Sequence, residues 1–354
     1  RFIMSEFKVN TITNRDGSHG PQVCGITTFG SSGMQLPSGP TEFRGGRGRG
    51  VVAGGYTPYT DTINKIEIAT TGDAIDFGNL IQVLRGPSNG VSSSTRGLFA
   101  GGLGPSGNVS LSVITYVTIS SEGNAYDYGD LTQGRFMING HSNNTRGIFT
   151  GGYSPTSPAD HVKTIDYVTI ASIGNATGFG DIQSVSGNNW STFGSGSSPT
   201  RGVFGGGYYG SPGTDVANIN YITIATLGNS ETFGSLTVAR RDVGGLSSST
   251  RAIFAGGTVG GDPSSNNTID YVTIATLGNA TDFGDMAEGG RNRPGCASNS
   301  IRGTFSGGRI SGSLVDSISF LTIASTGNTV DFGDLTYARY ELGGFSDTHG
   351  GLAQ

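Results

Sequence analysis

The sequence predicts an all-β fold built from repeats of four strands, and three observations lead to this prediction. Glycine supplies 63 of the 354 residues, and because it costs about 1 kcal/mol relative to alanine inside a helix, a helical architecture is disfavoured. Short β-branched and aromatic stretches lie between glycines or asparagines, which is typical of strands. Four such stretches recur in constant order about every 50 residues, which indicates a repeat architecture.

The first repeated stretch is hydrophobic, starts with arginine and, in every copy, ends in a glycine pair. We expect each arginine to cap a turn or to pair with a nearby aspartate. The alternative is that the six arginines line a channel and hold an anion. The arginines are Arg49, Arg96, Arg146, Arg201, Arg251 and Arg302.

The other three stretches complete an antiparallel meander. A Tyr-Val-Thr-Ile type of strand (residues 271–274) and an aromatic strand (Asp-Phe-Gly-Asp at 282–285) are joined by Leu-Gly-Asn-Ala at 277–280. Glycine and asparagine tolerate positive φ, so this linker predicts a tight hairpin. A glycine- and serine-rich strand (residues 244–249) then precedes the next arginine. The aromatic residue recurs in every copy, so we expect it in the core. The lysine strand and catalytic loop of a kinase, which also contains Asp-Phe-Gly, are absent.

Each sheet carries apolar residues on both faces, as in residues 269–276, where they alternate from one side to the other. Sheets that stack radially between two neighbours bury both faces, and this arrangement is a β-propeller. The C-terminal stretch, residues 341–353, resembles the start of a further repeat and then stops. We therefore expect it to supply the innermost strand of the first blade, which gives six blades. Seven blades result instead if residues 20–45 form an extra sheet with this stretch.

Residues 1–45 do not follow the period. Two strands are expected there, at residues 7–13 and 23–29, before prolines break the pattern. Such a segment has too little core to fold alone. We interpret residues 1–45 as an extended arm for attachment or oligomerisation, and residues 46–354 as the propeller.

Composition excludes several function classes. The net charge of −5 gives no overall attraction to nucleic acid, and no apolar run approaches the roughly 20 residues that span a bilayer. The 4 histidines are scattered and the 2 cysteines are too few for a metal or disulfide framework. We therefore expect no metal, no cofactor and no catalytic residues. A pair of carboxylates that cleaves glycosides stays open, because their separation depends on the fold.

The order of these strands resembles the Kelch repeat. Gly256 and Gly257 fit the glycine pair of that family and Tyr271 fits its tyrosine, whereas Phe283 stands where Kelch units usually carry tryptophan. A closer resemblance is to Kelch-like virion proteins of marine tailed bacteriophages, especially cyanophages. It rests on the lead-in at residues 35–50 and on the Thr-Ile-Ala-Thr and Asp-Phe-Gly-Asp-Leu phrases, and it covers nearly all of the chain. The resemblance is specific for fold and weak for biochemical role, because propellers have many functions.

The loops that follow each arginine-led strand, and those that precede each glycine-serine strand, differ between repeats, whereas the other turns are uniform. In a four-stranded blade these irregular loops lie on one face, and loops on a rigid scaffold are where function usually lies. Tyrosine and tryptophan suit sugar rings and protein surfaces. The alternative is that these rings only pack the loops, and the sequence does not decide between the two. The candidate recognition residues are Tyr56, Tyr59, Tyr153, Trp190, Tyr208 and Tyr209.

The resemblance implies a non-enzymatic virion protein, tail-fibre or tail-associated, assembled in the host cytoplasm. Its partners would be other virion proteins, bound through residues 1–45, and a glycan or protein of the host surface. Tail-fibre families are often trimeric, so a homo-trimer is one possibility, and the sequence leaves the oligomeric state open. Two alternatives stay open: a virion enzyme that degrades polysaccharide, and a purely structural decoration protein.

Overall fold

The computed structural model describes residues 27–28, 34–35, 48–105, 109–155, 160–183, 190–191, 194–209, 213–261 and 265–352. The chain divides into two compact units, Arg1–Glu42 and Phe43–Gln354. In the first unit, β1 (Thr27–Thr28) pairs antiparallel with β2 (Met34–Gln35). The rest of the two strands expected at residues 7–13 and 23–29 lies outside the described residues. Over the described ranges the chain contains no helix that could cross a membrane.

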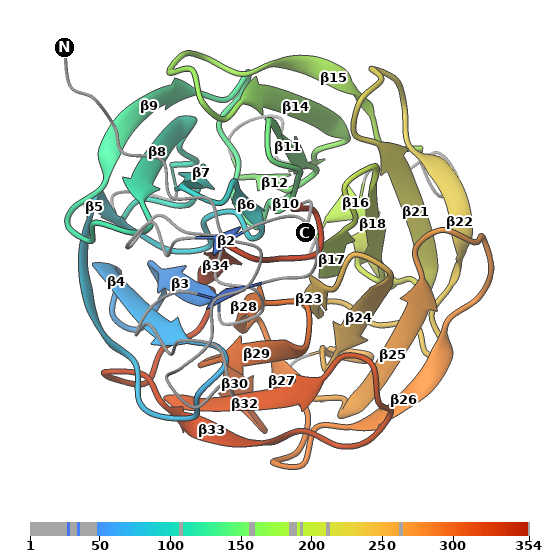
Figure 1. Ribbon diagram of the computed structural model, residues 1–354. Helices are drawn as coiled ribbons and strands as arrows, with labels where there is room; N and C mark the ends of the chain where they lie inside the picture. Colours follow the sequence, from blue (N-terminus) through green and yellow to red (C-terminus); the bar gives the residue numbers. More distant parts are fainter. Residues whose placement is uncertain are drawn as a thin grey trace, which may run out of the picture. The chain divides into compact units, whose positions relative to one another are not determined.

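The second unit consists of four-stranded antiparallel sheets, as predicted, and its described residues form no helix. Figure 1 shows the sheets arranged around a common centre, each with its first strand innermost. The first three sheets, from inner to outer strand, are β34 (Gly343–Ser346), β3 (Arg49–Ala53), β4 (Thr60–Glu67) and β5 (Ile75–Leu84); β6 (Val91–Ser92), β7 (Arg96–Ala100), β8 (Val113–Thr118) and β9 (Tyr126–Asp130); and β10 (Asn139–Ser142), β11 (Arg146–Thr150), β14 (Thr164–Thr169) and β15 (Thr177–Asp181).

The remaining three large sheets follow the same order along the chain. They are β17 (Gly194–Ser197), β18 (Arg201–Gly205), β21 (Asn218–Thr223) and β22 (Glu231–Ser235); β23 (Gly244–Ser247), β24 (Arg251–Ala255), β25 (Thr268–Thr273) and β26 (Thr281–Asp285); and β28 (Gly295–Ser298), β29 (Arg302–Ser306), β32 (Ser317–Thr322) and β33 (Val330–Asp334).

Smaller sheets form in the loops between these strands. They are β12 (Tyr153–Ser154) with β13 (Asp160–His161); β16 (Trp190–Ser191), β19 (Tyr208–Tyr209) and β20 (Thr214–Asp215); and β27 (Arg291–Asn292), β30 (Arg309–Ile310) and β31 (Ser313–Leu314).

The first sheet joins the two ends of the second unit. The inner strand β34 pairs antiparallel with β3, so that Phe345 stands opposite Val51. This pairing of the C-terminal stretch with the first arginine-led strand is the one that the sequence predicts. The strand is anchored in the core, because the buried ring of Phe345 lies 4.6 Å from that of Phe99 in the second sheet.

Each sheet is joined to the next by the predicted glycine-asparagine turn. The turn before β9 donates from Gly123 N to the Phe77 carbonyl at 2.8 Å, and Asn124 Oδ1 accepts from Asn79 N at 3.0 Å. A Cβ on Gly78 would lie 2.4 Å from the Gly123 carbonyl oxygen, so this close approach requires glycine. The sixth sheet meets the first in the same way, since Gly72 N donates to the Phe332 carbonyl at 2.8 Å.

The six strand-leading arginines also link neighbouring sheets, which corrects part of the sequence prediction. The guanidinium of Arg96 donates to the Ile170 carbonyl of the third sheet at 2.9 Å and lies 4.5 Å from the ring of Tyr116 in its own sheet. It therefore caps a turn, as predicted, but the turn belongs to the next sheet. The equivalent bonds run from Arg49 to Ile119, Arg146 to Ile224, Arg201 to Ile274, Arg251 to Ile323 and Arg302 to Ala69.

The hydrophobic core lies between successive sheets as six clusters, one of which joins the sixth sheet to the first. The prediction that the recurrent aromatic residue belongs to the core is confirmed. These buried residues are Phe77, Tyr128, Phe179, Phe233, Phe283 and Phe332.

A second set of arginines is completely buried between sheets: Arg135, Arg240, Arg291 and Arg339. Two of them pair with an aspartate on the third strand of the following sheet: Arg135 with Asp166 and Arg240 with Asp270, both at 2.9 Å. A buried charge is costly unless it is paired and hydrogen-bonded, so these pairs are structural. We call these four residues the latch arginines.

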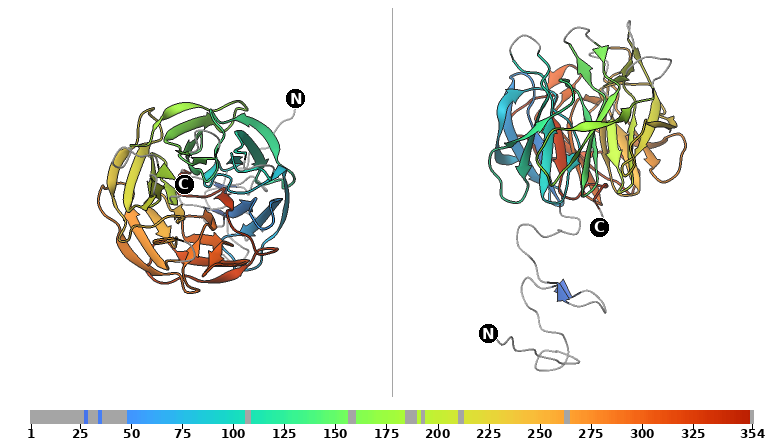
Figure 2. Two further views of the ribbon diagram at one scale, coloured as in Figure 1. Left: turned by 180° about the vertical axis from the view of Figure 1, so that it is seen from behind. Right: turned by 90° about the horizontal axis from the view of Figure 1, so that it is seen from above.

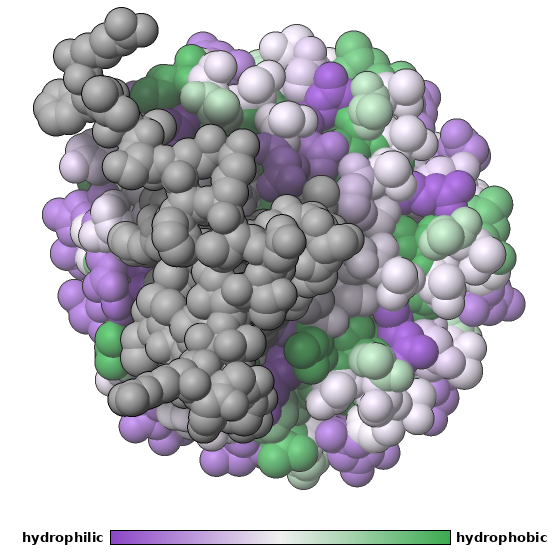
Figure 3. Space-filling view, viewed as in Figure 1, coloured by the Kyte–Doolittle hydropathy of each residue, from purple (hydrophilic) through white to green (hydrophobic). Residues whose placement is uncertain are grey.

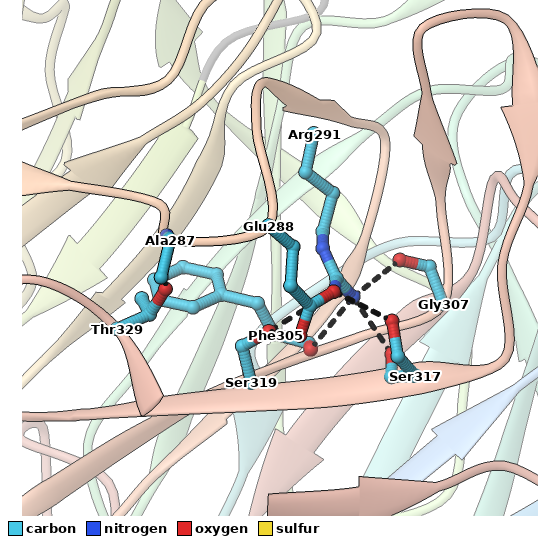
Figure 4. A network of polar contacts seen from close by, with 8 residues as sticks. All are labelled: Ala287, Glu288, Arg291, Phe305, Gly307, Ser317, Ser319 and Thr329. Carbon is cyan, nitrogen blue, oxygen red and sulfur yellow. Dashed lines mark hydrogen bonds and ion pairs between the residues drawn. The ribbon is translucent and has the colours of Figure 1, made fainter. Parts of the chain in front are cut away.

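Arg291, the latch arginine that precedes the sixth sheet, pairs with a carboxylate from a different position. We call each latch arginine together with its partners the latch of the sheet that follows it. Ser319 stands where the fifth sheet has Asp270, and Glu288 supplies the carboxylate from the preceding loop (Figure 4). Arg291 donates to Glu288 Oε2 at 2.6 Å, and Ser319 donates to Glu288 Oε1 at 2.8 Å. Burial acts to raise the pKa of Glu288, but Arg291 and the serine hydroxyls outweigh it and hold this pKa below its usual value.

One end of the centre is filled by the C-terminal segment. Serines of the inner strands bond from sheet to sheet there: Ser92 Oγ donates to the Ser346 carbonyl at 2.6 Å, and Ser298 Oγ donates to the Ser247 carbonyl at 2.8 Å. His349 enters this end, where its Nε2 lies 3.1 Å from the Ser92 carbonyl. Its Nδ1 accepts from Gly351 N at 3.0 Å, which requires the neutral ring.

We expect stability to fall in mild acid because of two buried histidines. Burial is the main cause that lowers the pKa of His141 and of His349 from 6.5 to about 4. As the pH falls, the histidines of the unfolded chain therefore take up protons before those of the folded chain. The contribution of the neutral histidines to the free energy of unfolding is complete above pH 6.5 and is lost as the pH falls towards 4. Each histidine contributes about 3 kcal/mol at most. Urea unfolding between pH 7 and 5 measures this slope.

The double variant His141→Gln and His349→Gln is the control for this slope. It should be less stable at pH 7 and should lose less stability than the original chain between pH 7 and 5. An unchanged slope in the double variant would show that other groups cause the acid sensitivity.

Candidate functional site

The second unit has two unlike faces. The uniform turns join inner to second strands and third to outer strands, and we call their side the regular face. Both ends of the described second unit lie there. A Cβ on Gly48, just before β3, would lie 2.1 Å from Thr348 Oγ1, and Gly350 N donates to the carbonyl of Ser247, the last residue of the inner strand β23, at 3.1 Å. The side view in Figure 2 shows the C-terminus at this end of the sheets. The irregular loops form the opposite side, the irregular face.

The irregular loops are tied to one another by backbone pairing. Isolated bridges join Tyr56 to Tyr340 and Phe136 to Tyr153, and the small sheets described above lie in the same loops. In each of these pairs, the loop that leads into a sheet meets the loop between its second and third strands. The described loops therefore present their side chains from a supported backbone.

The structure brings four of the six predicted residues into two aromatic groups. Tyr56 and Tyr59 pack edge to face at 5.0 Å between ring centroids. Tyr153 and Tyr208 do not touch each other directly, but His161 lies between them, 5.3 Å from the first ring and 5.7 Å from the second. All four tyrosines are half-buried. They support the loops and also leave part of each ring at the surface.

The other two predicted residues are placed differently. Tyr209 is half-buried and packs against the core cluster between the third and fourth sheets. The backbone of Trp190 pairs with that of Tyr209, while the side chain of Trp190 lies outside the described part of the chain.

Arginines connect these aromatic groups. The guanidinium of Arg85 lies 4.3 Å from the ring centroid of Tyr56 and 5.7 Å from that of Phe136. On the other side, the guanidinium of Arg241 lies 4.3 Å from the ring centroid of Tyr208. Arginine over an aromatic face is attracted by the ring quadrupole, so both guanidinium groups are held in place at the surface.

Backbone bonds join the described segments that lead into five of the inner strands, at the centre of the irregular face. We call the residues that these bonds join the collar: Gly86, Met137, Asp242, Arg293 and Glu341. Arg293 N donates to the Asp242 carbonyl at 3.0 Å, and Glu341 N donates to the Arg293 carbonyl at 3.1 Å. The same bonding continues through Gly86 to Met137. All five residues have φ between 51° and 61°, a conformation that is uncommon for residues other than glycine.

Three charged side chains of the collar form a triad. The Arg293 guanidinium lies between two carboxylates: its Nε is 3.0 Å from Asp242 Oδ1, and its Nη1 contacts Glu341 Oε1. The carboxylate side chains are only 4% and 2% exposed. Burial alone would lower the pKa of Arg293, but both carboxylates outweigh it and raise this pKa above its ordinary value.

The triad lines a cavity that opens on the irregular face. Its empty volume is about 420 Å³ with the solvent at the opening included. Neighbouring lining residues are Pro87, Asn89, Asn139, Val243 and Leu342. Sequence reasoning missed this site, because it selected irregular loops rich in aromatic rings. The available signal was the position just before each glycine-serine strand, where the repeats carry glycine, methionine or charged residues.

Within the described residues, no group of three or more histidine, cysteine, aspartate or glutamate side chains is placed to hold a metal ion. No protein-family model matches the chain, and no match was found among curated proteins. The geometry of the two faces therefore carries the functional argument.

Proposed function

We propose that the second unit is a six-bladed Kelch-like β-propeller in a non-enzymatic virion protein, tail-fibre or tail-associated. Its irregular face contacts the host surface or another virion protein. Support for the fold comes from the chain of contacts between sheets. Inner strands contact their neighbours all around, from β34 through β6, β10, β17, β23 and β28 back to β34. All six large sheets have four strands, so the proposal takes six blades rather than seven.

The observation that carries the functional proposal is the separation of the two faces. Both described ends of the second unit lie on the regular face. An arm that joins this unit to a particle therefore leaves the irregular face free to meet another surface. The half-buried tyrosines and stacked arginines of that face are the residue types enriched in interfaces.

Support for attachment through the regular face comes from three of its turns. Ile173, Leu227 and Leu277 occupy the same turn in successive sheets and are 61%, 57% and 56% exposed. The other three sheets have Thr71, Glu122 and Thr326 at this position. Figure 3, viewed from the regular face, shows hydrophobic groups scattered among hydrophilic ones around the rim. Exposed apolar side chains on three neighbouring turns of the same face suit contact with a protein partner in the particle.

The test is attachment of the purified full chain to host cells. We expect alanine replacement of Trp190, Tyr208 and Tyr209 together to reduce attachment about tenfold or more, because buried aromatic residues dominate interface energy. The Tyr126→Ala variant is the control, since Tyr126 is exposed on the outer strand β9. Circular dichroism and thermal unfolding verify the fold of each variant.

The same assay separates the alternatives. Attachment that is unchanged in the triple alanine variant contradicts the assignment of the irregular face. Sugars released from host envelope glycans would favour the enzyme. Binding to virion proteins with no binding to cells would favour the decoration protein.

A further inference from the structure

We propose that the collar cavity binds a single neutral sugar unit of a surface glycan. This inference rests on the proposed recognition role of the irregular face and names its ligand class. It is carried by the three charged residues Asp242, Arg293 and Glu341, whose side chains line the cavity.

The fold does not require charges at these positions. The equivalent residues of the second and third sheets are Gly86 and Met137, which make the same backbone bonds in the same conformation. Burying ionised groups is costly, and replacing buried ion pairs with apolar residues is often neutral or stabilising. The backbone bonds of the collar therefore do not explain why charged residues occupy three neighbouring collar positions.

The charge balance of the site disfavours a free ion. Arg85 Nε lies 3.4 Å from Glu341 Oε2, and Arg241 Nη1 lies 3.0 Å from Asp215 Oδ1. The cavity lining itself carries two carboxylates and one guanidinium. Arg85 and Arg241, which lie behind Glu341 and Asp242, and Asp215 complete a network of three guanidinium groups and three carboxylates that is neutral overall. Fixed donors and acceptors at zero net charge match a neutral ligand that both donates and accepts hydrogen bonds. Neighbouring hydroxyl groups on a sugar ring have this property.

Several acceptor atoms at the cavity also receive no hydrogen bond within the described chain. They are Asp242 Oδ1, Glu341 Oε2 and Asn89 Oδ1. The first two are buried oxygens in ion pairs, Asp242 Oδ1 at 3.0 Å from Arg293 Nε and Glu341 Oε2 at 3.4 Å from Arg85 Nε, and neither pair has hydrogen-bond geometry. Small adjustments of these side chains towards a sugar hydroxyl would supply the missing donors, and an unmet buried acceptor costs about 1–3 kcal/mol.

The surroundings suit one edge of a sugar ring. The empty volume of about 420 Å³ includes open solvent at the mouth, so only part of one sugar unit enters the cavity and the rest stays at the surface. Tyr56 and Phe136 flank Arg85 next to the collar. Aromatic rings there offer apolar area to the C–H faces of the sugar units that follow the bound one.

The experiment is saturation-transfer NMR on the full chain with the methyl glycosides of glucose, galactose, mannose and N-acetylglucosamine. We expect transfer to at least one of them. The combined variant Asp242→Asn, Arg293→Met and Glu341→Gln should weaken binding at least tenfold, with a thermal unfolding midpoint close to that of the original chain. Glu341→Gln alone, which keeps the shape, is the second variant if the combined one does not fold. Tyr126→Ser on β9 is the matched control and should bind normally.

Three results would overturn the inference: no transfer to any glycoside, equal binding by the folded variants, or competition by sulfate or acetate, which would indicate an anion site. Cell attachment is measured in parallel. If the collar variants fail to alter sugar binding while the Trp190, Tyr208 and Tyr209 variant loses attachment, the sugar site is wrong and the proposed function stands. If the original chain does not attach to cells at all, the proposed host contact fails by itself.

Discussion

Removal of residues 343–354 should abolish the cooperative fold of the second unit. The deletion takes away β34, which is the inner strand of the first sheet, and the buried segment up to Leu352. It leaves β3 as an unpaired edge and removes Phe345 from its contact with Phe99. An exposed edge next to an opened core is prone to aggregation. We expect no sigmoidal unfolding transition in circular dichroism, and aggregated or expanded material in gel filtration.

A rearranged chain provides the control for this deletion. Residues 343–346 are placed directly before Arg49, joined by a Ser-Ser-Thr turn like the one at residues 93–95 that links β6 to β7. This variant restores the pairing of β34 with β3 without the C-terminal segment, and it should unfold cooperatively. A truncated chain that melts like the full chain would show that the C-terminal strand is dispensable.

Two substitutions in the latch should change stability in opposite directions. Asp270→Asn removes the carboxylate that pairs with the completely buried Arg240 and should destabilise the fold by about 3–5 kcal/mol. The latch of the first sheet lacks a carboxylate, because Arg339 Nη2 donates instead to the amide oxygen of Asn64 at 2.8 Å. Burial lowers the pKa of Arg339. Asn64→Asp supplies the missing charge at nearly the same shape and should stabilise by about 1–3 kcal/mol.

Urea unfolding at pH 7 compares the two latch variants with the original chain. Each acts as the control for the other, because both exchange an amide and a carboxylate at the same position of the repeat. Midpoints that move in the same direction would contradict the electrostatic account of the latch.

Most of the local fold could be predicted from the sequence, because the repeat displays each strand six times. The pairing of β34 with β3 follows from the partial repeat at the C-terminus. Contacts between sheets could not be predicted, since they depend on how the sheets stack. Arg96 meets Ile170 across 74 positions of the chain, and no local pattern distinguishes that carbonyl from a nearby aspartate.

The candidate site was predicted only in part. Aromatic rings in irregular loops led to Tyr56, Tyr153 and Tyr208, which the structure places in two half-buried groups. The collar was missed, because Asp242 and Glu341 are isolated charges in the sequence and become neighbours only through Arg293. A position-by-position comparison of the repeats would have found them, since charge appears where other repeats have glycine or methionine.

The most direct test of the account is a density map of the virion proposed to carry this chain, at a resolution that distinguishes the two faces of the second unit. We predict that the regular face, where the described ends of the second unit lie, is directed towards the particle and that the collar and irregular loops are directed outwards. A map with the irregular face buried against the particle and the regular face outermost would contradict the proposed recognition surface.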